Sequence, residues 1–131
     1  MVPDVASKGG SGKAESQLRK GVLEYCVLGL LRSGARYGVE LLEVLGSVNV
    51  MATSQGTIYP LLARLRRDGL VDTTWQESPS GPPRRYYMLT PQGEAALTEF
   101  TEIWPHFRDA VDRFITDETT ELPLPLPGDS L

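Results

Sequence analysis

Two short segments in the first half of the chain repeat one apolar spacing, and this repeat limits the folds open to the sequence. The spacing i, i+3, i+4, i+7 is shared by Gly38, Leu41, Leu42 and Leu45 and by Ile58, Leu61, Leu62 and Leu65. Such a spacing places apolar side chains on one face of a helix. We therefore expect two amphipathic helices, the second beginning after the N-cap residue Ser54 and ending at Gly69.

A longer helix is expected before this pair, from Gln17 to Arg32. Its apolar residues cover more than one stripe: Val22, Leu23, Cys26, Val27, Leu30 and Leu31. A helix that is apolar over most of its circumference is buried on most sides. In a small chain this burial is expected to involve a second subunit, so Leu23 is a candidate interface residue.

The apolar period changes after Gly69. The stretch from Leu70 to Gln76 is rich in Val, Thr and Trp, and the stretch from Arg84 to Leu89 contains two tyrosines. Residues 78–83, between them, consist of Ser, Pro and Gly. This pattern predicts a β-hairpin with a long, exposed tip.

A last helix is predicted from Thr90, an N-cap candidate, and Pro91, which suits the first helical position. Its large apolar residues follow spacings of three and four, as in a coiled-coil seam. The seam consists of Leu97, Phe100, Trp104, Phe107, Val111 and Phe114, widened by Ile103. We expect residues 91–116 to form a long C-terminal dimerisation helix.

The predicted fold is thus mainly α with a small β-hairpin. Residues 17–90 are expected to form a winged helix-turn-helix DNA-binding domain, because two short helices and a two-stranded wing define that motif. Residues 1–16 lack an apolar period and are predicted to be a disordered arm. Residues 117–131 are acidic and proline-rich, which predicts a disordered tail. A polyproline-II docking segment is the alternative for the tail.

The charge distribution is uneven. The formal net charge is −4, but residues 18–90 carry nine Lys/Arg against six Asp/Glu, whereas residues 91–131 carry two against nine. Phosphates interact mainly with charges within about 8 Å at physiological salt, so a local basic surface matters more than the total. The absence of a signal peptide or a long apolar run predicts a cytoplasmic chain without membrane contact.

The sequence contains few of the residues and motifs that a catalytic site would need. The chain has one histidine, His106, and one cysteine, Cys26, so we expect neither a metal site nor a disulfide. Glycine-rich phosphate loops and nucleophile elbows are missing. We therefore expect a protein that is not an enzyme and that needs no cofactor.

Four stretches resemble one known family, the PadR-type transcriptional regulators, over about residues 19–116. They read RKGVLEYCVLGLL, RYGVELLEVL, SQGTIYPLLARLRRDGLV and RRYYMLTPQGEAAL. The short C-terminal part is similar to the smaller subfamily with a single C-terminal helix. The resemblance implies a homodimer, usually a repressor, whose C-terminal helix packs against the partner's first helix. The proline-rich wing tip and Pro105 depart from the family pattern.

The predicted functional site is a DNA-binding surface. The candidates for DNA contact are Tyr37, Ser54, Gln55, Gly56, Thr57, Tyr59, Arg64, Arg84 and Arg85. Gln55 can bond adenine in two places, and Thr57 can contact a base edge or a thymine methyl. In the family, the tyrosine equivalent to Tyr59 belongs to the DNA face.

Structural alternatives stay open for several of these residues. Ser54 can be a plain helix cap, Tyr59 an ordinary packing residue and Arg64 part of a solvated face. Arg84 or Arg85 can instead pair across the hairpin with Asp72 or Glu77.

The predicted function is a repressor that binds double-stranded operator DNA, an inverted repeat, as a homodimer. Interface candidates are Leu23, Leu97, Phe100, Ile103, Trp104, Phe107, Val111 and Phe114. Some PadR-like proteins bind flat aromatic compounds between subunits, and Trp104 is the candidate contact for such an effector. The alternatives are a protein-binding winged helix without a DNA role and a small-molecule carrier.

Overall fold

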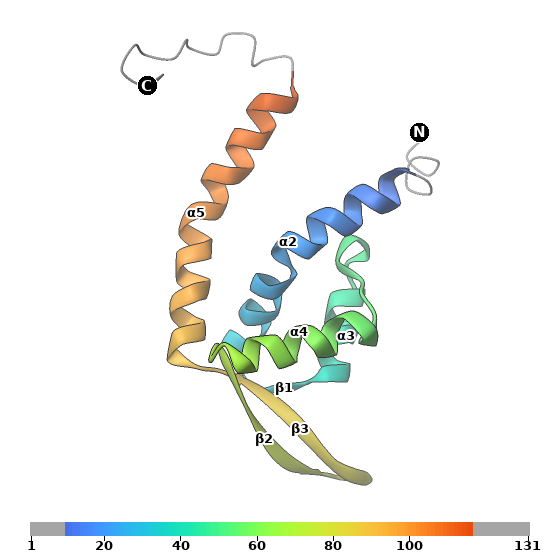
Figure 1. Ribbon diagram of the computed structural model, residues 1–131. Helices are drawn as coiled ribbons and strands as arrows, with labels where there is room; N and C mark the ends of the chain where they lie inside the picture. Colours follow the sequence, from blue (N-terminus) through green and yellow to red (C-terminus); the bar gives the residue numbers. More distant parts are fainter. Residues whose placement is uncertain (1–9, 117–131) are drawn as a thin grey trace. The chain divides into compact units, whose positions relative to one another are not determined.

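The computed structural model describes residues 10–116. Its elements are α2 (Gly10–Arg32), β1 (Arg36–Tyr37), α3 (Gly38–Gly46), the 3-10 helix η1 (Asn49–Met51), α4 (Gln55–Arg67), β2 (Val71–Ser78), β3 (Gly81–Leu89) and α5 (Pro91–Ile115) (Figure 1). The predicted class, mainly helical with a small antiparallel sheet, is confirmed. The sheet has the order β1-β3-β2, and its two-residue strand β1 was not predicted.

Local chemistry sets two of the predicted boundaries. Gly69 has φ +81°, a left-handed conformation that suits the residue after a helix. The Thr90 hydroxyl accepts a hydrogen bond from the N–H of Gly93 at 3.0 Å and donates one to the Gly69 carbonyl at 2.7 Å. The predicted cap of the last helix therefore also joins that helix to the end of α4.

The start of the first helix was predicted wrongly. α2 begins at Gly10, so residues 10–16 are helical rather than part of a disordered arm. Once a helix has formed, each added residue costs little, and Lys13, Ala14 and Glu15 are good helix formers that need no apolar period. The predictions for residues 1–9 and 117–131 lie outside the described residues.

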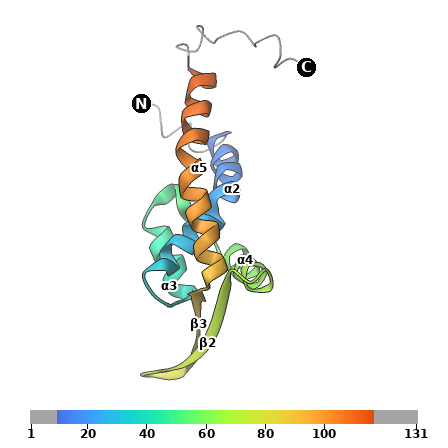
Figure 2. The ribbon, with the colours of Figure 1, turned by 90° about the vertical axis from the view of Figure 1, so that its left-hand side faces the viewer.

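The hairpin has a much shorter tip than predicted. β2 and β3 extend to Ser78 and Gly81, which pair with each other, so Pro82 and Pro83 lie within β3. Prolines are tolerated in a strand at an edge or a bulge. Both conditions hold, because β1 pairs β3 only at Tyr86 and Tyr87 and the register between Gln76 and Ser78 is irregular. Figures 1 and 2 show this hairpin projecting from the helices that precede it.

One core holds α2, α3, α4 and the sheet together. Its buried side chains are Leu23, Val27, Leu28, Leu31, Leu41, Leu45, Ile58, Leu62, Leu65, Val71, Tyr87 and Leu97. Both of the predicted amphipathic faces point into this core. The chain divides into two compact units between Thr98 and Glu99. The first turns of α5 belong to the first unit, and the remainder of α5 is a separate unit.

Candidate nucleic-acid interface

The first turn of α4 presents small polar residues to solvent. Ser54 takes the predicted N-cap position, and its hydroxyl lies 3.4 Å from that of Thr57. Gln55, Gly56 and Thr57 are exposed. A Cβ on Gly56 would meet only the Ser54 hydroxyl, at 3.7 Å, so this turn leaves room for a close neighbour. The turn can therefore offer hydroxyl and amide groups to the edges of bases.

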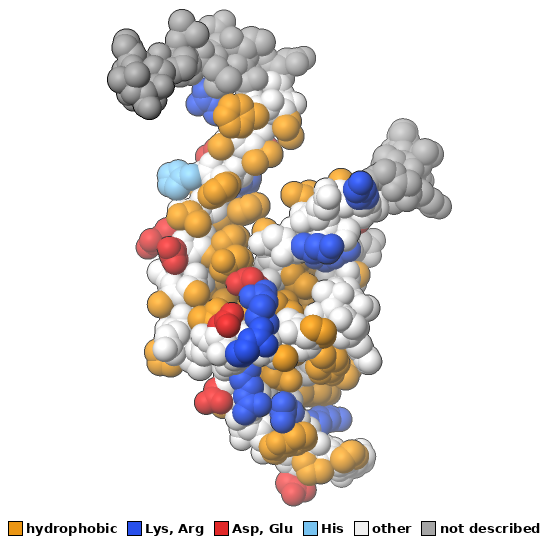
Figure 3. All heavy atoms as spheres, viewed as in Figure 1, with side chains coloured by type: hydrophobic (Ala, Val, Ile, Leu, Met, Phe, Trp, Pro, Cys, Tyr) orange, Lys and Arg blue, Asp and Glu red, His pale blue; other side chains and the backbone are white. Residues whose placement is uncertain are grey.

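A groove next to this turn, which we call the wing groove, combines aromatic rings with two guanidinium groups. It is lined by Tyr37, Gly38, Val39, Tyr59, Trp75, Arg84, Arg85 and Tyr87 and has a volume of about 330 Å³. None of these lining residues is acidic. Figure 3 shows Lys and Arg side chains gathered over α4 and the base of the hairpin, beside hydrophobic side chains. Such a groove suits a ligand with apolar and anionic parts.

Both arginines of the wing groove lie over aromatic rings. The Arg84 guanidinium carbon is 4.4 Å from the centre of the Tyr37 ring, and that of Arg85 is 5.0 Å from the centre of the Trp75 ring. A cation–π contact of this kind holds a guanidinium against a ring, and its terminal Nη–H groups can still donate hydrogen bonds. The register of the hairpin places Arg85 opposite Trp75 and Arg84 opposite Gln76. Neither arginine forms an ion pair with Asp72 or Glu77, so the alternative in which one of them pairs across the hairpin is not seen among the described residues.

The Arg85 side chain also has unused hydrogen-bonding capacity. Its Nε atom is buried and lacks a hydrogen-bond partner among the described residues. A buried polar group without a partner costs free energy, and such a group in a folded protein calls for an explanation. Because the atom is buried, a ligand in the groove would reach it only after the Arg85 side chain moved.

Tyr59 packs tightly at the edge of the wing groove. A Cβ atom on Gly38 would overlap its hydroxyl and ring, so glycine at the first position of α3 makes room for the tyrosine. The side chain is still 38% exposed. Tyr59 therefore combines the packing role that the sequence left open with an accessible surface.

The structure gives Arg64 a partner within the fold. Its guanidinium forms an ion pair with Glu24 of α2 at 2.9 Å and lies 3.8 Å from Asp68. The hydrogen bond with Glu24 raises the pKa of Arg64 above its ordinary value. Arg64 thus joins α4 to α2 and is not among the lining residues of the wing groove.

Two of the predicted interface residues are core residues of the subunit itself. Leu23 and Leu97 are each only 4% exposed and belong to the buried cluster. The prediction that they lie in a dimer interface is therefore corrected. It failed because an apolar pattern does not reveal whether a face meets its own core or a second chain.

The second unit exposes the remainder of the predicted seam. Ile103, Trp104, Phe107, Val111 and Phe114 are each at least 40% exposed. Phe100 is partly buried and stacks on Trp104, with ring centres 5.6 Å apart and planes 20° apart. We call the exposed residues together with Phe100 the α5 apolar face. Large apolar side chains that cluster in this way mark an interaction surface.

The first unit has an apolar groove of its own, which the sequence did not reveal. The α2–η1 groove has a volume of about 220 Å³ and is lined by Glu15, Leu18, Arg19, Val22, Val50 and Met51. Arg19 closes one side by donating a hydrogen bond to the Val50 carbonyl. The predicted helix from Gln17 already placed Leu18 and Val22 one turn apart, but no sequence signal showed that Val50 and Met51 would lie beside them.

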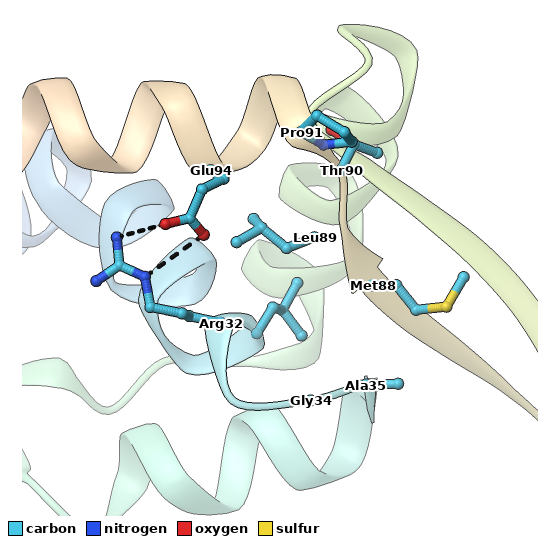
Figure 4. Close-up of a pocket in the computed structure, with 9 residues that line it drawn as sticks. Arg32, Gly34, Ala35, Met88, Leu89, Thr90, Pro91 and Glu94 are labelled. Atoms are coloured by element: carbon cyan, nitrogen blue, oxygen red, sulfur yellow. Dashed lines mark hydrogen bonds and ion pairs between the residues drawn. The ribbon is translucent and has the colours of Figure 1, made fainter.

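A third pocket lies where α5 begins. It is lined by Leu31, Arg32, Gly34, Ala35, Met88, Leu89, Thr90, Pro91 and Glu94, and its volume is about 370 Å³ (Figure 4). Its two charged lining residues, Arg32 and Glu94, form an ion pair with each other at 3.0 Å. The pair joins the end of α2 to the first turns of α5, so we interpret this pocket as structural.

The residues that could carry metal or thiol chemistry lie apart. Within residues 10–116, no three His, Cys, Asp or Glu side chains group closely enough to hold a metal ion. Cys26 is half-buried, and burial raises the pKa of its thiol. Nor does any helix in this range have the length and apolar character that crossing a bilayer requires.

The arrangement of α3, α4 and the β2–β3 hairpin on one core defines a winged helix-turn-helix protein. The model of the transcriptional regulator PadR-like family matches residues 27–99. This chain belongs to the PadR-like family of transcriptional regulators.

Solved structures and a curated relative agree with this assignment. A PadR-like transcription factor from Bacteroides fragilis is 39% identical, with a TM-score of 0.65, and the match covers 78% of this chain and 98% of that one. A PadR family regulator from Eggerthella lenta is 30% identical, with a TM-score of 0.75 and coverages of 86% and 98%. The transcriptional regulator Rv3488 of Mycobacterium tuberculosis is 52% identical over 46 residues, which are 35% of this chain and 42% of that protein.

Proposed function

We propose that this regulator represses transcription in the cytoplasm by binding an inverted-repeat operator as a homodimer. The observation that carries the proposal is the wing groove beside the first turn of α4. Its two arginines are held by aromatic rings, and none of its lining residues is a carboxylate that would repel phosphate. Phosphate contacts fix the position of a protein on DNA, whereas contacts to base edges read the sequence.

In this proposal, α4 enters the major groove. Gln55 bonds an adenine edge, Thr57 meets a base edge or a thymine methyl, and Gly56 allows the backbone to come close. The hydroxyl groups of Ser54 and Tyr59 donate hydrogen bonds to phosphate oxygens. Tyr37, Arg84 and Arg85 hold the DNA strand that passes between α3 and the wing. The proposed contact does not include Arg64, because Glu24 engages its guanidinium.

A second copy of this chain is the proposed occupant of both exposed apolar surfaces. The α5 apolar face carries Trp104 and Phe107 at 40% and 63% exposure, and the α2–η1 groove is lined by Leu18, Val22, Val50 and Met51. Burying one such side chain contributes about 1.5–3 kcal/mol. In a two-fold dimer, α5 of each subunit can cover α2 of the other, which buries both surfaces at once.

The proposed effector is a flat aromatic compound that binds at Trp104. The indole already stacks on Phe100, so the site has the geometry for a further aromatic ring. Release of DNA requires that the compound prefer a dimer shape in which the two α4 helices no longer fit successive major grooves.

The test is to footprint the purified protein on the DNA that flanks its own gene. We expect a protected inverted repeat whose half-sites are about one helical turn apart. Gln55→Ala should lower affinity for this site more than affinity for unrelated DNA. If no fragment is protected at low salt, the DNA-binding proposal is wrong, and the acidic net charge of −4 would favour a protein-binding winged helix.

A further inference from the structure

Trp75 is an exposed indole on one face of the β2–β3 hairpin. The same face is buried in the core where β2 begins. Side chains alternate along a strand, so Val71, Thr73 and Trp75 of β2 share one face. Val71 is 2% exposed and belongs to the core, whereas Trp75 is 61% exposed. The core-facing side of the wing therefore continues beyond the core, and its outer end lines the wing groove.

The indole is held in place although it is exposed. Arg85 stands opposite Trp75 in the hairpin register and lies over its ring. This contact engages one face of the indole and leaves a large part of the ring accessible. An exposed tryptophan that is fixed by a neighbour loses little conformational freedom when a ligand covers it, which favours binding.

Tyr59 places this indole next to the proposed DNA-reading turn. It lies in α4 one turn after Gln55 and lines the wing groove together with Trp75. A DNA strand whose bases face the first turn of α4 would therefore bring its backbone into the groove. Along that backbone, apolar deoxyribose faces alternate with phosphates, and the groove offers apolar rings beside guanidinium groups.

We propose that Trp75 packs against a deoxyribose of the operator strand in the wing groove, while the terminal Nη–H groups of Arg85 donate to an adjacent phosphate. This inference rests on the proposed DNA-binding function and adds a residue to it. It explains why an indole is exposed here. The contact contributes affinity rather than base recognition, because sugars and phosphates are the same at every step.

The experiment measures operator affinity of the full-length chain over a range of salt concentrations. Trp75→Ala should weaken binding about tenfold without changing the slope of log K against log salt, because it removes apolar contact and no charge. Trp75→Phe should restore most of the loss. Arg85→Ala should lower the slope by about one, because one phosphate contact is lost. The control is Gln76→Ala, at the next position on the other face of β2, which should bind within about twofold of wild type.

Hydroxyl-radical footprinting on the same operator reports directly on deoxyribose. Wild-type protein and Gln76→Ala should protect a sugar beside the wing in each half-site, and Trp75→Ala should leave it unprotected. Wild-type affinity and full sugar protection in Trp75→Ala would overturn the inference while the DNA-binding proposal stands. A lower salt slope in Trp75→Ala with the sugar still protected would also overturn it, because Trp75 would then only position Arg85. An aromatic acid or acidic peptide that needs Trp75, when DNA does not, would overturn it as well.

Discussion

The phenol of Tyr59 lies where a Cβ atom on Gly38 would be, so the first residue of α3 and the second turn of α4 meet at a point that admits only a hydrogen atom. The neighbouring atoms are the outer end of the Tyr59 side chain, so an added Cβ would displace the phenol ring rather than the backbone. This contact also forms one end of the wing groove, since both residues line it. A change at Gly38 should therefore affect the fold and the proposed DNA contact together.

Replacing Gly38 by alanine should destabilise the protein by about 1 kcal/mol, the low end of overpacking costs, because the partly exposed Tyr59 ring can turn aside. Operator affinity should also fall, since Tyr59 must leave its position. The matched control is Gly46→Ala at the last position of the same helix, where an added Cβ meets nothing within 4 Å. Alanine there should leave stability unchanged or raise it by up to about 0.5–1 kcal/mol. Thermal and urea unfolding measure both effects, and equal melting temperatures for the two variants would contradict the packing argument.

Removing the partner of Arg64 should have a small, salt-sensitive effect. The Arg64 and Glu24 side chains are 43% and 23% exposed, and ion pairs with this exposure contribute about 1 kcal/mol or less. Glu24→Gln should thus lower the free energy of unfolding by about 0.5–1 kcal/mol at low salt, and by less in 1 M NaCl. The control is Glu43→Gln, an exposed residue of α3.

The same pair predicts how Arg64 behaves toward DNA. Arg64→Ala should change operator affinity and its salt slope much less than Arg85→Ala does, because Glu24 already neutralises the Arg64 charge. A slope that falls by about one in Arg64→Ala would show that its guanidinium leaves Glu24 for a phosphate when DNA binds.

The thiol of Cys26 should react with alkylating reagents more slowly in the folded protein than in the unfolded protein. Burial raises its pKa, so the native state favours the neutral thiol. The stability that this pKa difference contributes is fully present below the pKa of Cys26 in the unfolded protein, about 8.5. It is lost as the pH rises through the higher pKa of Cys26 in the folded protein. The alkylation rate with iodoacetamide should therefore have its midpoint at a higher pH in the native protein than in urea. Coincident midpoints would show that Cys26 is more accessible than the structure indicates.

The parts of the fold that local chemistry determines could be predicted from the sequence. The cap at Thr90, the left-handed Gly69 and the two amphipathic faces each depend on a few neighbouring residues. Ser54 takes the predicted N-cap position, although its hydroxyl makes no capping hydrogen bond to the backbone. The apolar spacing also identified the long last helix and most of the α5 apolar face.

Two kinds of feature could not be predicted in this way: those that depend on the register of the hairpin strands, and those that depend on whether an apolar side chain packs in its own core, against a second chain or in solvent. The bulge that lets Pro82 and Pro83 enter β3 also sets which residue lies opposite each wing arginine, so their aromatic partners were missed. Leu23 has the same apolar character as an interface residue, and only the packed core shows that its own subunit buries it. Trp75 was overlooked because its strand alternates normally, and its exposure depends on where the core ends.

The dimer proposal is tested by introducing one negative charge on or beside the α5 apolar face. Phe107 is 63% exposed and lies on the predicted seam, whereas His106, the adjacent residue, lies off it. Phe107→Asp should produce a monomer, because a carboxylate in an apolar interface is desolvated without a partner. His106→Asp introduces the same side chain one position away and should remain dimeric.

Because the first unit has its own core, both variants should keep a folded winged domain, seen as cooperative thermal unfolding. Sedimentation velocity gives the oligomeric state, and operator titration should show that only the monomer loses cooperative binding to the two half-sites. A Phe107→Asp protein that sediments as a dimer would exclude this face as the main interface, and the α2–η1 groove would then need another partner.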